Sequence, residues 1–281
     1  MRKKSRSEPK RVFQRQKNRT GRQLARVSAV KYRETIWSEL YPGNQHTIAC
    51  FRPAVLATEN ALELAAAQRQ RTVWRMDGGA GSDDQFRWLL ARNYHVIAKG
   101  LSNFRANALA NSVRRWDTYD DCQLAEVPPP VDYGRPVRVF VKRRWKDGKW
   151  THSYYVSTLQ LPSKMYFIEY YHQRGGAEVE QFRQDKQGLY LAARRKSSFT
   201  GQQGYILLTD LVHNLLADFR HRALSGTRFA DYGLKRIVRD LLHIPGRLYF
   251  DGQQLKRIEL LKLNQNSQDL IICLERYCLG E

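Results

Sequence analysis

An aspartate followed by several glycines is the first feature of the sequence that could carry out chemistry. Asp77 comes directly after residues 72–76, a short run typical of a strand, and is followed by Gly78, Gly79 and Gly81. A carboxylate at the C-terminal end of a strand, beside residues without side chains, leaves room for a metal ion or a phosphate group to approach. An ordinary turn at the end of a strand explains the same residues, and the pattern alone does not decide between the two.

Four polar residues with helical spacing form a second candidate site. In a helix, Arg174 and Glu178 lie one turn apart on the same face, Tyr171 lies one turn earlier, and Lys186 follows about two turns later. The simpler explanation is an ion pair on a helix surface. The flanking residues, however, add cations and amide donors, which are typical of a helix that faces phosphate groups.

Positive charge is concentrated near the N-terminus. The 281 residues include 48 Lys and Arg against 27 Asp and Glu, a net charge of +21, and residues 1–33 hold thirteen of these cations and one acid, Glu8. Such a segment releases counterions when it meets phosphates, so it predicts salt-dependent binding to nucleic acid. A second basic cluster, Arg194, Arg195 and Lys196, supports the same prediction. A solvated tail and attraction to anionic lipid are the alternatives.

Cysteine usage and hydropathy exclude several classes of protein. The four cysteines form no C-x-x-C pair and the histidines show no metal-binding spacing, which argues against zinc and a disulfide framework and suits a reducing cytoplasm. The most apolar long stretch, residues 205–219, contains Asp210, His213 and Asp218. A bilayer-spanning helix needs about 20 mostly apolar residues, so no membrane span is expected.

The elements that must position these residues alternate between strand and helix. The expected elements are one or two strands over 24–37, a helix over 53–70, a strand over 72–76, a helix over 83–92 and a strand over 94–98. This order predicts an α/β sheet layer. A hairpin over 137–145 and 149–159, turning at Lys146-Asp147-Gly148-Lys149, is expected as a separate β element. Helices are expected over 166–187 and 202–224, and strands over 247–250 and 256–263.

A methyltransferase or dinucleotide-binding loop is a weaker explanation of the glycines. Residues 77–81 read D-x-G-x-G, but the third glycine of those fingerprints is missing. Asp83 stands in its place, and an additional acid there would repel a phosphate. A nucleic-acid methyltransferase therefore remains the third choice.

Taken together, these motifs resemble those of the DDE transposases of bacterial insertion sequences. The resemblance rests on Asp77-Gly-Gly, Y-x2-R-x3-E over 171–178, D-K-Q-G-L over 185–189, R-R-K over 194–196 and H-N-L-L over 213–216. It implies an RNase H-like core, a mixed sheet flanked by helices with a β insertion before the last catalytic helix. It further implies DNA cleavage and strand transfer at double-stranded transposon ends, and it allows for a homodimer on DNA.

The resemblance also implies roles for individual residues. Asp77 would be the second catalytic acid and Glu178 the third, together binding two Mg²⁺ or Mn²⁺ ions. Tyr171, Arg174 and Lys186 would contact DNA phosphates. In the β insertion, Trp145 and Trp150 are candidates for stacking on a flipped base, with a simple cross-strand pair as the alternative.

The sequence departs from the family pattern in two places. The family lysine usually falls seven residues after the glutamate, where this chain has Asp185, and Lys186 is one residue late; Glu180 is therefore an alternative third acid. Residues 1–76 contain no aspartate to serve as the first acid. We therefore expect that the chain starts after that acid and that its activity is weak or absent, and a non-catalytic DNA-binding remnant is the alternative.

The expected organisation along the chain has five segments. They are a basic N-terminal segment (1–23), the first part of the core (24–118), the β insertion (119–165), the catalytic helix with the following core helix (166–225) and an α/β tail (226–281).

Overall fold

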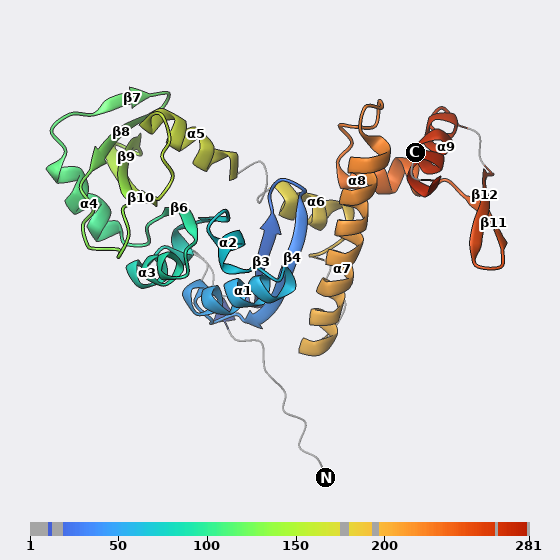
Figure 1. Cartoon of the computed structure of the whole chain (residues 1–281), viewed down its shortest axis with the longest axis horizontal. Helices are drawn as coiled ribbons and strands as arrows, with labels where there is room; N and C mark the ends of the chain where they lie inside the picture. The colour runs from blue at the N-terminus through green and yellow to red at the C-terminus, as the bar shows by residue number, and fades with distance from the viewer. Residues whose placement is uncertain (1–10, 13–18, 175–179, 193–196, 262–263, 280–281) are drawn as a thin grey trace, which may run out of the picture. The chain divides into compact units, whose positions relative to one another are not determined.

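The computed structural model describes residues 11–12, 19–174, 180–192, 197–261 and 264–279. The chain divides into two compact units, each built from segments that are distant in sequence (Figure 1). Residues 1–25 and 41–176 form unit 1, and residues 26–40 and 177–281 form unit 2.

A six-stranded mixed sheet is the centre of unit 1. Its strands are β5 (Val73–Met76), β6 (His95–Lys99), β7 (Asp117–Tyr119), β8 (Cys122–Val127), β9 (Arg138–Lys146) and β10 (Lys149–Ser157). They are arranged in the order β5-β6-β10-β9-β8-β7. β5 and β6 run parallel, and the remaining neighbours are antiparallel.

Helices cover both faces of this sheet because apolar residues alternate along its strands. On β10, Tyr154 and Val156 pack with α1 (Thr47–Ala61), α3 (Asp83–Ala91) and α4 (Asn103–Ser112). The intervening Tyr155 packs on the opposite face with α5 (Lys164–Arg174). This alternation has the two-residue period of a strand buried on both sides. Unit 1 is therefore a three-layer α/β/α arrangement, and the fold class expected from the sequence is confirmed.

The hairpin of β9 and β10 is confirmed, but the expectation of a separate β element is wrong. Residues Tyr155–Ser157 of β10 pair with Ile97–Lys99 of β6, so the hairpin continues the sheet of β5 and β6. The physical reason is that both faces of the hairpin are apolar near β6: Val139 and Val141 face one helix layer and Phe140 faces the other.

The helix expected over 53–70 is two helices instead. α1 begins at Thr47 and contains Pro53, and α2 spans Ala66–Arg69. The break falls at Glu63, whose φ of 49° lies in the left-handed region that no helix can pass through. α4 and α9 (Ser267–Leu279) were not expected at all.

Unit 2 combines a β hairpin with helices from the C-terminal third of the chain. The hairpin consists of β3 (Arg22–Ala29) and β4 (Glu34–Pro42), and the other elements are α6 (Glu180–Gly188), α7 (Phe199–Phe219), the π-helical turns η3 (Arg220–Leu224) and η4 (Ile237–Leu241), α8 (Leu234–Arg236), β11 (Gly246–Asp251), β12 (Gln254–Leu260) and α9. Its apolar core includes Leu216, Phe219, Phe229, Ile237 and Leu270. The expected long helix over 202–224 and the strands near 247–250 and 256–263 correspond to α7 with η3, and to β11 and β12.

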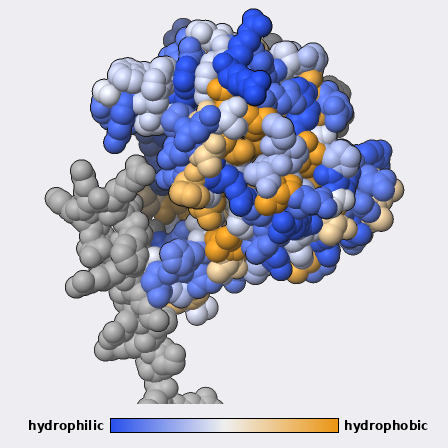
Figure 2. Space-filling view, turned by 90° about the vertical axis from the view of Figure 1, so that its left-hand side faces the viewer, coloured by the Kyte–Doolittle hydropathy of each residue, from blue (hydrophilic) through white to orange (hydrophobic). Residues whose placement is uncertain are grey.

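Two short strands, β1 (Arg11–Val12) and β2 (Arg19–Thr20), pair near the N-terminus. The side of unit 1 seen in Figure 2 is mostly hydrophilic, with apolar residues gathered in patches between the polar ones. Among the described residues, none of the helices combines the length and the apolar character needed to cross a bilayer.

Candidate active site

Asp77 lies at the C-terminal end of β5, where the chain leaves the sheet. Its side chain is exposed and accepts a hydrogen bond from the backbone N–H of Gly79 at 2.9 Å, which caps the short 3-10 helix η1 (Gly78–Ala80). Ligands of α/β proteins bind beyond the carboxyl ends of parallel strands, and β5 runs parallel to β6. The structure thus puts the predicted catalytic acid at the edge of the sheet where a site is expected.

The glycines after Asp77 hold the ends of β5 and β6 together. A Cβ atom at Gly81 would overlap the carbonyl group of Lys99, and the backbone N–H of Leu101 donates to the carbonyl of Gly81 at 2.9 Å. A Cβ atom at Gly79 would lie 3.3 Å from a methyl carbon of Thr47. Close packing therefore explains Gly81 and contributes at Gly79, while the contacts around Gly78 are ordinary.

Two further side chains surround the end of β5. The side chain of Lys99, the last residue of β6, lies against Gly78, since a Cβ there would be 3.7 Å from its Cδ atom. The hydroxyl of Tyr171 in α5 donates to the backbone carbonyl of Met76 at 3.3 Å, and Tyr171 is 5% exposed. Tyr171 thus lies against the residue that precedes Asp77. Its predicted contact with a DNA phosphate stays a prediction.

Several predicted site residues lie outside the described residues. These are Glu178, Arg194, Arg195 and Lys196, and the side chain of Arg174, the last residue of α5, is likewise not described. The convergence of Asp77 and Glu178 on a shared metal site therefore stays a prediction.

The structure places Lys186 of the second candidate site and Glu180 on α6. Lys186 is exposed. The carboxylate of Glu180, the alternative third acid, accepts hydrogen bonds from Arg183 at 2.6 and 2.7 Å and from Gln184 at 3.1 Å. The hydrogen bond from Arg183 and then that from Gln184 lower the pKa of Glu180. This carboxylate is thus already engaged by its own helix.

Trp145 and Trp150 face each other across the β9–β10 hairpin. They are directly opposite in the strand register, and their rings make an edge-to-face contact at 5.2 Å. Both remain partly accessible, at 58% and 41% exposed, and the guanidinium of Arg143 lies 4.5 Å from the ring of Trp150. The cross-strand pair is therefore present, and stacking on a base stays a prediction.

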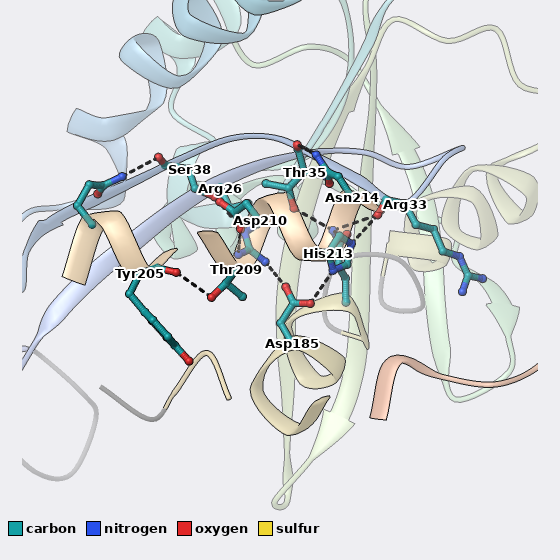
Figure 3. A network of polar contacts seen from close by, with 12 residues as sticks. Arg26, Arg33, Thr35, Ser38, Asp185, Tyr205, Thr209, Asp210, His213 and Asn214 are labelled. Atoms are coloured by element: carbon teal, nitrogen blue, oxygen red, sulfur yellow. Dashed lines mark hydrogen bonds and ion pairs between the residues drawn. The ribbon is translucent and has the colours of Figure 1, made fainter. Parts of the chain in front are cut away.

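Unit 2 contains a buried network of charged residues centred on Arg26 (Figure 3). The Arg26 guanidinium on β3 donates to Asp185 of α6 at 2.5 Å and also to Asp210 of α7. On the other side of Asp185, His213 Nδ1 lies 2.6 Å from the carboxylate, and His213 Nε2 lies 2.7 Å from the carbonyl oxygen of Arg33. The side chains of Arg26 and Asp185 are 1% and 0% exposed.

The network changes the protonation of its members. Burial alone would lower the pKa of His213, but the hydrogen bond to Asp185, the charge of that carboxylate and the Arg33 carbonyl raise it overall. Burial raises the pKa of Asp210, partly offset by Arg26. Acceptors lie at both ring nitrogens of His213 and favour its doubly protonated, positive form, although the side-chain amide nitrogen of Gln181 also lies 2.9 Å from Nε2. In that form, Arg26 and His213 face the carboxylates of Asp185 and Asp210 inside unit 2.

Two amide side chains of α7 bind the backbone of β4. Asn214 accepts from the N–H of Thr35 and donates to its carbonyl, both at 2.8 Å. Gln203 likewise accepts from Leu40 N–H at 2.7 Å and donates to the Ser38 carbonyl at 3.2 Å. The His-Asn pair of the H-N-L-L motif, with Asp185 of the D-K-Q-G-L motif, thus joins α6, α7 and the β3–β4 hairpin.

This packing accounts for the departure from the family pattern at position 185. A lysine there would bury a second cation beside Arg26, whereas Asp185 neutralises it. The following residue, Lys186, is exposed and is free of this constraint. The side chain that points into unit 2 is therefore the aspartate.

The described residues near Asp77 do not complete a metal site by themselves. Within them, no group of three or more His, Cys, Asp or Glu side chains is placed to hold a metal ion. Asp77 is a hard oxygen donor of the kind that Mg²⁺ prefers, so it fits one ligand position. Glu178, which the resemblance implies as a further ligand, lies outside the described residues, so its role stays a prediction.

Both the fold and the site define an RNase H-like α/β protein with a carboxylate at a strand end. Residues 2–215 match the family model of the transposase DDE domain. This match covers more than half of the chain, so the protein belongs to the DDE transposase family. A search of curated proteins finds no match.

Reasoning from the sequence missed Lys99 and the network around Arg26. Lys99 could have been found, because it ends the strand that follows Asp77 and its helix, and the ends of neighbouring parallel strands lie together. No local pattern marks Arg26, since its partners are 159 and 184 residues away.

Proposed function

We propose that this chain cuts and joins DNA at the ends of an insertion sequence, with Asp77 and Glu178 as metal-binding catalytic acids. The observation that supports this function best is the place of Asp77. It follows a parallel strand in the family-matched α/β core, and its carboxylate is oriented by the cap on Gly79.

The reaction is an in-line displacement at phosphorus. Water first attacks the phosphodiester and the P–O3′ bond breaks, leaving a 3′-hydroxyl and a 5′-phosphate. The freed 3′-hydroxyl then attacks a target phosphodiester, whose own P–O3′ bond breaks and releases a target 3′-hydroxyl. Two Mg²⁺ or Mn²⁺ ions, when bound, would stabilise the attacking and leaving oxygens. Asp77 and Glu178 would hold these ions.

Basic and aromatic residues hold the DNA. Arg174 offers a fork of donors to a phosphate, and Lys186 offers a point charge. The cluster of Arg194, Arg195 and Lys196 and the basic segment 1–23 add sequence-independent attraction to the backbone. Trp145 and Trp150 supply exposed rings on which a displaced base can stack.

We further propose that these 281 residues nick DNA weakly or not at all alone. No aspartate precedes Asp77. Two carboxylates then have to neutralise two divalent ions, which leaves the site short of negative charge. Action as a dimer on DNA, in the cytoplasm, belongs to the same proposal.

A nicking assay on supercoiled circular DNA or on a short linear duplex, with Mg²⁺ or Mn²⁺, tests the function. Asp77→Asn is the sharpest variant, because the amide oxygen can still accept from Gly79 while the negative charge is lost. Any metal-dependent nicking by the wild-type chain should fall by about 100-fold or more in this variant, as for the loss of a key electrostatic group. The matched control is Asp84→Asn, an exposed carboxylate of the same unit.

The outcomes separate the two hypotheses. Nicking that persists in Asp77→Asn would remove Asp77 from the mechanism. Salt-sensitive DNA binding without nicking by any variant, with either metal, would favour the non-catalytic DNA-binding remnant.

A further inference from the structure

Unit 2 contains a pocket of about 230 Å³ that is lined by cations. It lies between the β3–β4 turn, α6, the C-terminal part of α7 and the η3 turn. Its polar lining consists of Lys31, Tyr32, Arg33, Gln184, His213, Arg220, His221 and Ser225. No acidic side chain lines this pocket among the described residues.

The charges of this pocket are not neutralised locally. Within the described part of the chain, no ion pair forms to Lys31, Arg33 or Arg220. Lys31 contacts the ring of Tyr32 at 5.2 Å, and Arg220 donates its Nε–H to the carbonyl of Ala230 at 3.1 Å. Two guanidinium groups and an ammonium group therefore share one cavity without a carboxylate partner.

Two acids outside the pocket lining act on these cations through their charge. The charge of Arg33 lowers the pKa of Glu180, whose carboxylate is paired with Arg183. The charge of Asp231 raises the pKa of Arg220, which only partly offsets the opposing effects. Burial lowers the pKa of Arg220, and the positive charge of Arg33 lowers it further. Mutual repulsion of this kind is relieved when an anion binds.

The buried network fixes the turn that carries two of these cations. The carbonyl of Arg33 accepts from His213 at 2.7 Å and from Gln181 at 3.3 Å. In Figure 3 the guanidinium of Arg33 points away from these bonds. Arg33 also has a φ of 59°, a left-handed conformation that is uncommon for a residue other than glycine. The side chain thus extends from a backbone that is held in place.

We propose that this pocket binds a phosphate group of the DNA backbone. Guanidinium groups match phosphate oxygens with paired hydrogen bonds, and Lys31 adds a point charge. The proposal rests on DNA as the substrate of the proposed function, and it adds a phosphate contact in unit 2 through Arg33 and Arg220, which lie outside the family motifs.

Salt-dependent binding of the full chain to a short duplex, without added metal, tests this assignment. Arg33→Gln removes a charge at an exposed position, so the fold should survive, and melting temperature checks this. We expect weaker binding and a slope of log K against log salt concentration that is smaller by about 0.9, the change for one lost phosphate contact. Arg33→Gln combined with Arg220→Gln should reduce the slope further. Arg247→Gln, an exposed cation of β11 outside the pocket, is the control and should change the slope less.

A second arm uses inorganic phosphate alone and follows the imidazole resonances of His221. Phosphate should shift them in the wild type and not in Arg33→Gln. Equal slopes for Arg33→Gln and Arg247→Gln would overturn the proposal. A phosphate-induced shift without any effect of Arg33→Gln on duplex binding would also overturn it, and would leave only a site for free anions.

The variant Asp77→Asn separates this proposal from the proposed function. It should bind the duplex with the wild-type slope, because residue 77 is not part of the pocket. A failure of nicking therefore leaves the pocket assignment intact, and an unchanged slope in Arg33→Gln leaves the catalytic assignment intact.

Discussion

The buried Arg26 guanidinium restricts the residue types that can lie beside it on α6 and α7. Two carboxylates face one guanidinium in a region with almost no solvent, so each charge depends on the others. Burying a charge without a partner costs several kcal/mol, whereas a balanced cluster is roughly neutral in free energy. The cluster is therefore better understood as specifying how β3, α6 and α7 pack than as a source of stability.

Removing the Arg26 charge should destabilise unit 2 strongly. We expect Arg26→Met to lower the free energy of unfolding by about 3–5 kcal/mol, because Asp210 then remains buried without its counter-charge and Asp185 keeps only His213. Urea unfolding followed by circular dichroism measures this loss. Arg26→Lys keeps the charge but loses the forked geometry, so a smaller loss is expected; equal losses would show that charge is not the cause.

The stability of unit 2 should depend on pH through His213. The hydrogen bond to Asp185 and its charge outweigh burial and raise the pKa of His213 in the folded state above the ordinary histidine value of 6.5. The stabilisation is therefore fully present below about pH 6.5 and is lost as pH rises through the raised folded-state pKa. Unfolding at mildly acidic and mildly alkaline pH should show this decline, and His213→Gln should flatten it. His243→Gln, at an exposed position, should leave the decline unchanged.

Among the elements, the β9–β10 hairpin is one that the sequence pattern predicts correctly. Asp147 and Gly148 have φ values of 52° and 73°, as a two-residue hairpin turn requires, and this turn was readable from the residues alone. Its pairing with β6 was not, because the choice of neighbouring strand depends on contacts distant in sequence. The same limit explains why Asp77 could be placed at a strand end while its surroundings could not.

The ends of β5 and β6 are in such close contact that a side chain at Gly81 should destabilise unit 1. A methyl group in Gly81→Ala would overlap the Lys99 carbonyl, and relieving this should cost about 1–3 kcal/mol and move the loop that carries Asp77. Melting temperature and nicking should both fall. Gly204→Ala, in α7 where a methyl group meets nothing within 4 Å, should be neutral or stabilising. Similar melting temperatures for the two variants would contradict this account of Gly81.

At the scale of the whole molecule, the uneven charge should set how binding depends on salt. Residues 1–18 contain eight Lys and Arg and one acid. Their removal should weaken duplex binding and reduce the slope of log K against log salt concentration by several units if most of these cations contact phosphates. Fluorescence anisotropy over a salt series measures the slope. An unchanged slope would favour a solvated tail.

The two-unit organisation was beyond prediction from the sequence. Residues 26–40 read as ordinary strands, and nothing local indicates that they belong with residues 177–281. Arg26, Asn214 and Gln203 make the connection through hydrogen bonds that span more than half of the chain.

The same separation has a consequence during protein synthesis. Asp185 is made 159 residues after Arg26, so at about 5–20 residues per second the hairpin waits roughly 8 to 32 s on the ribosome for its partners. Meanwhile the residues of unit 1 that lie between them emerge and can fold first. A nascent chain halted before α6 would therefore expose a hairpin with an unpaired arginine, which is a target for chaperones and proteases.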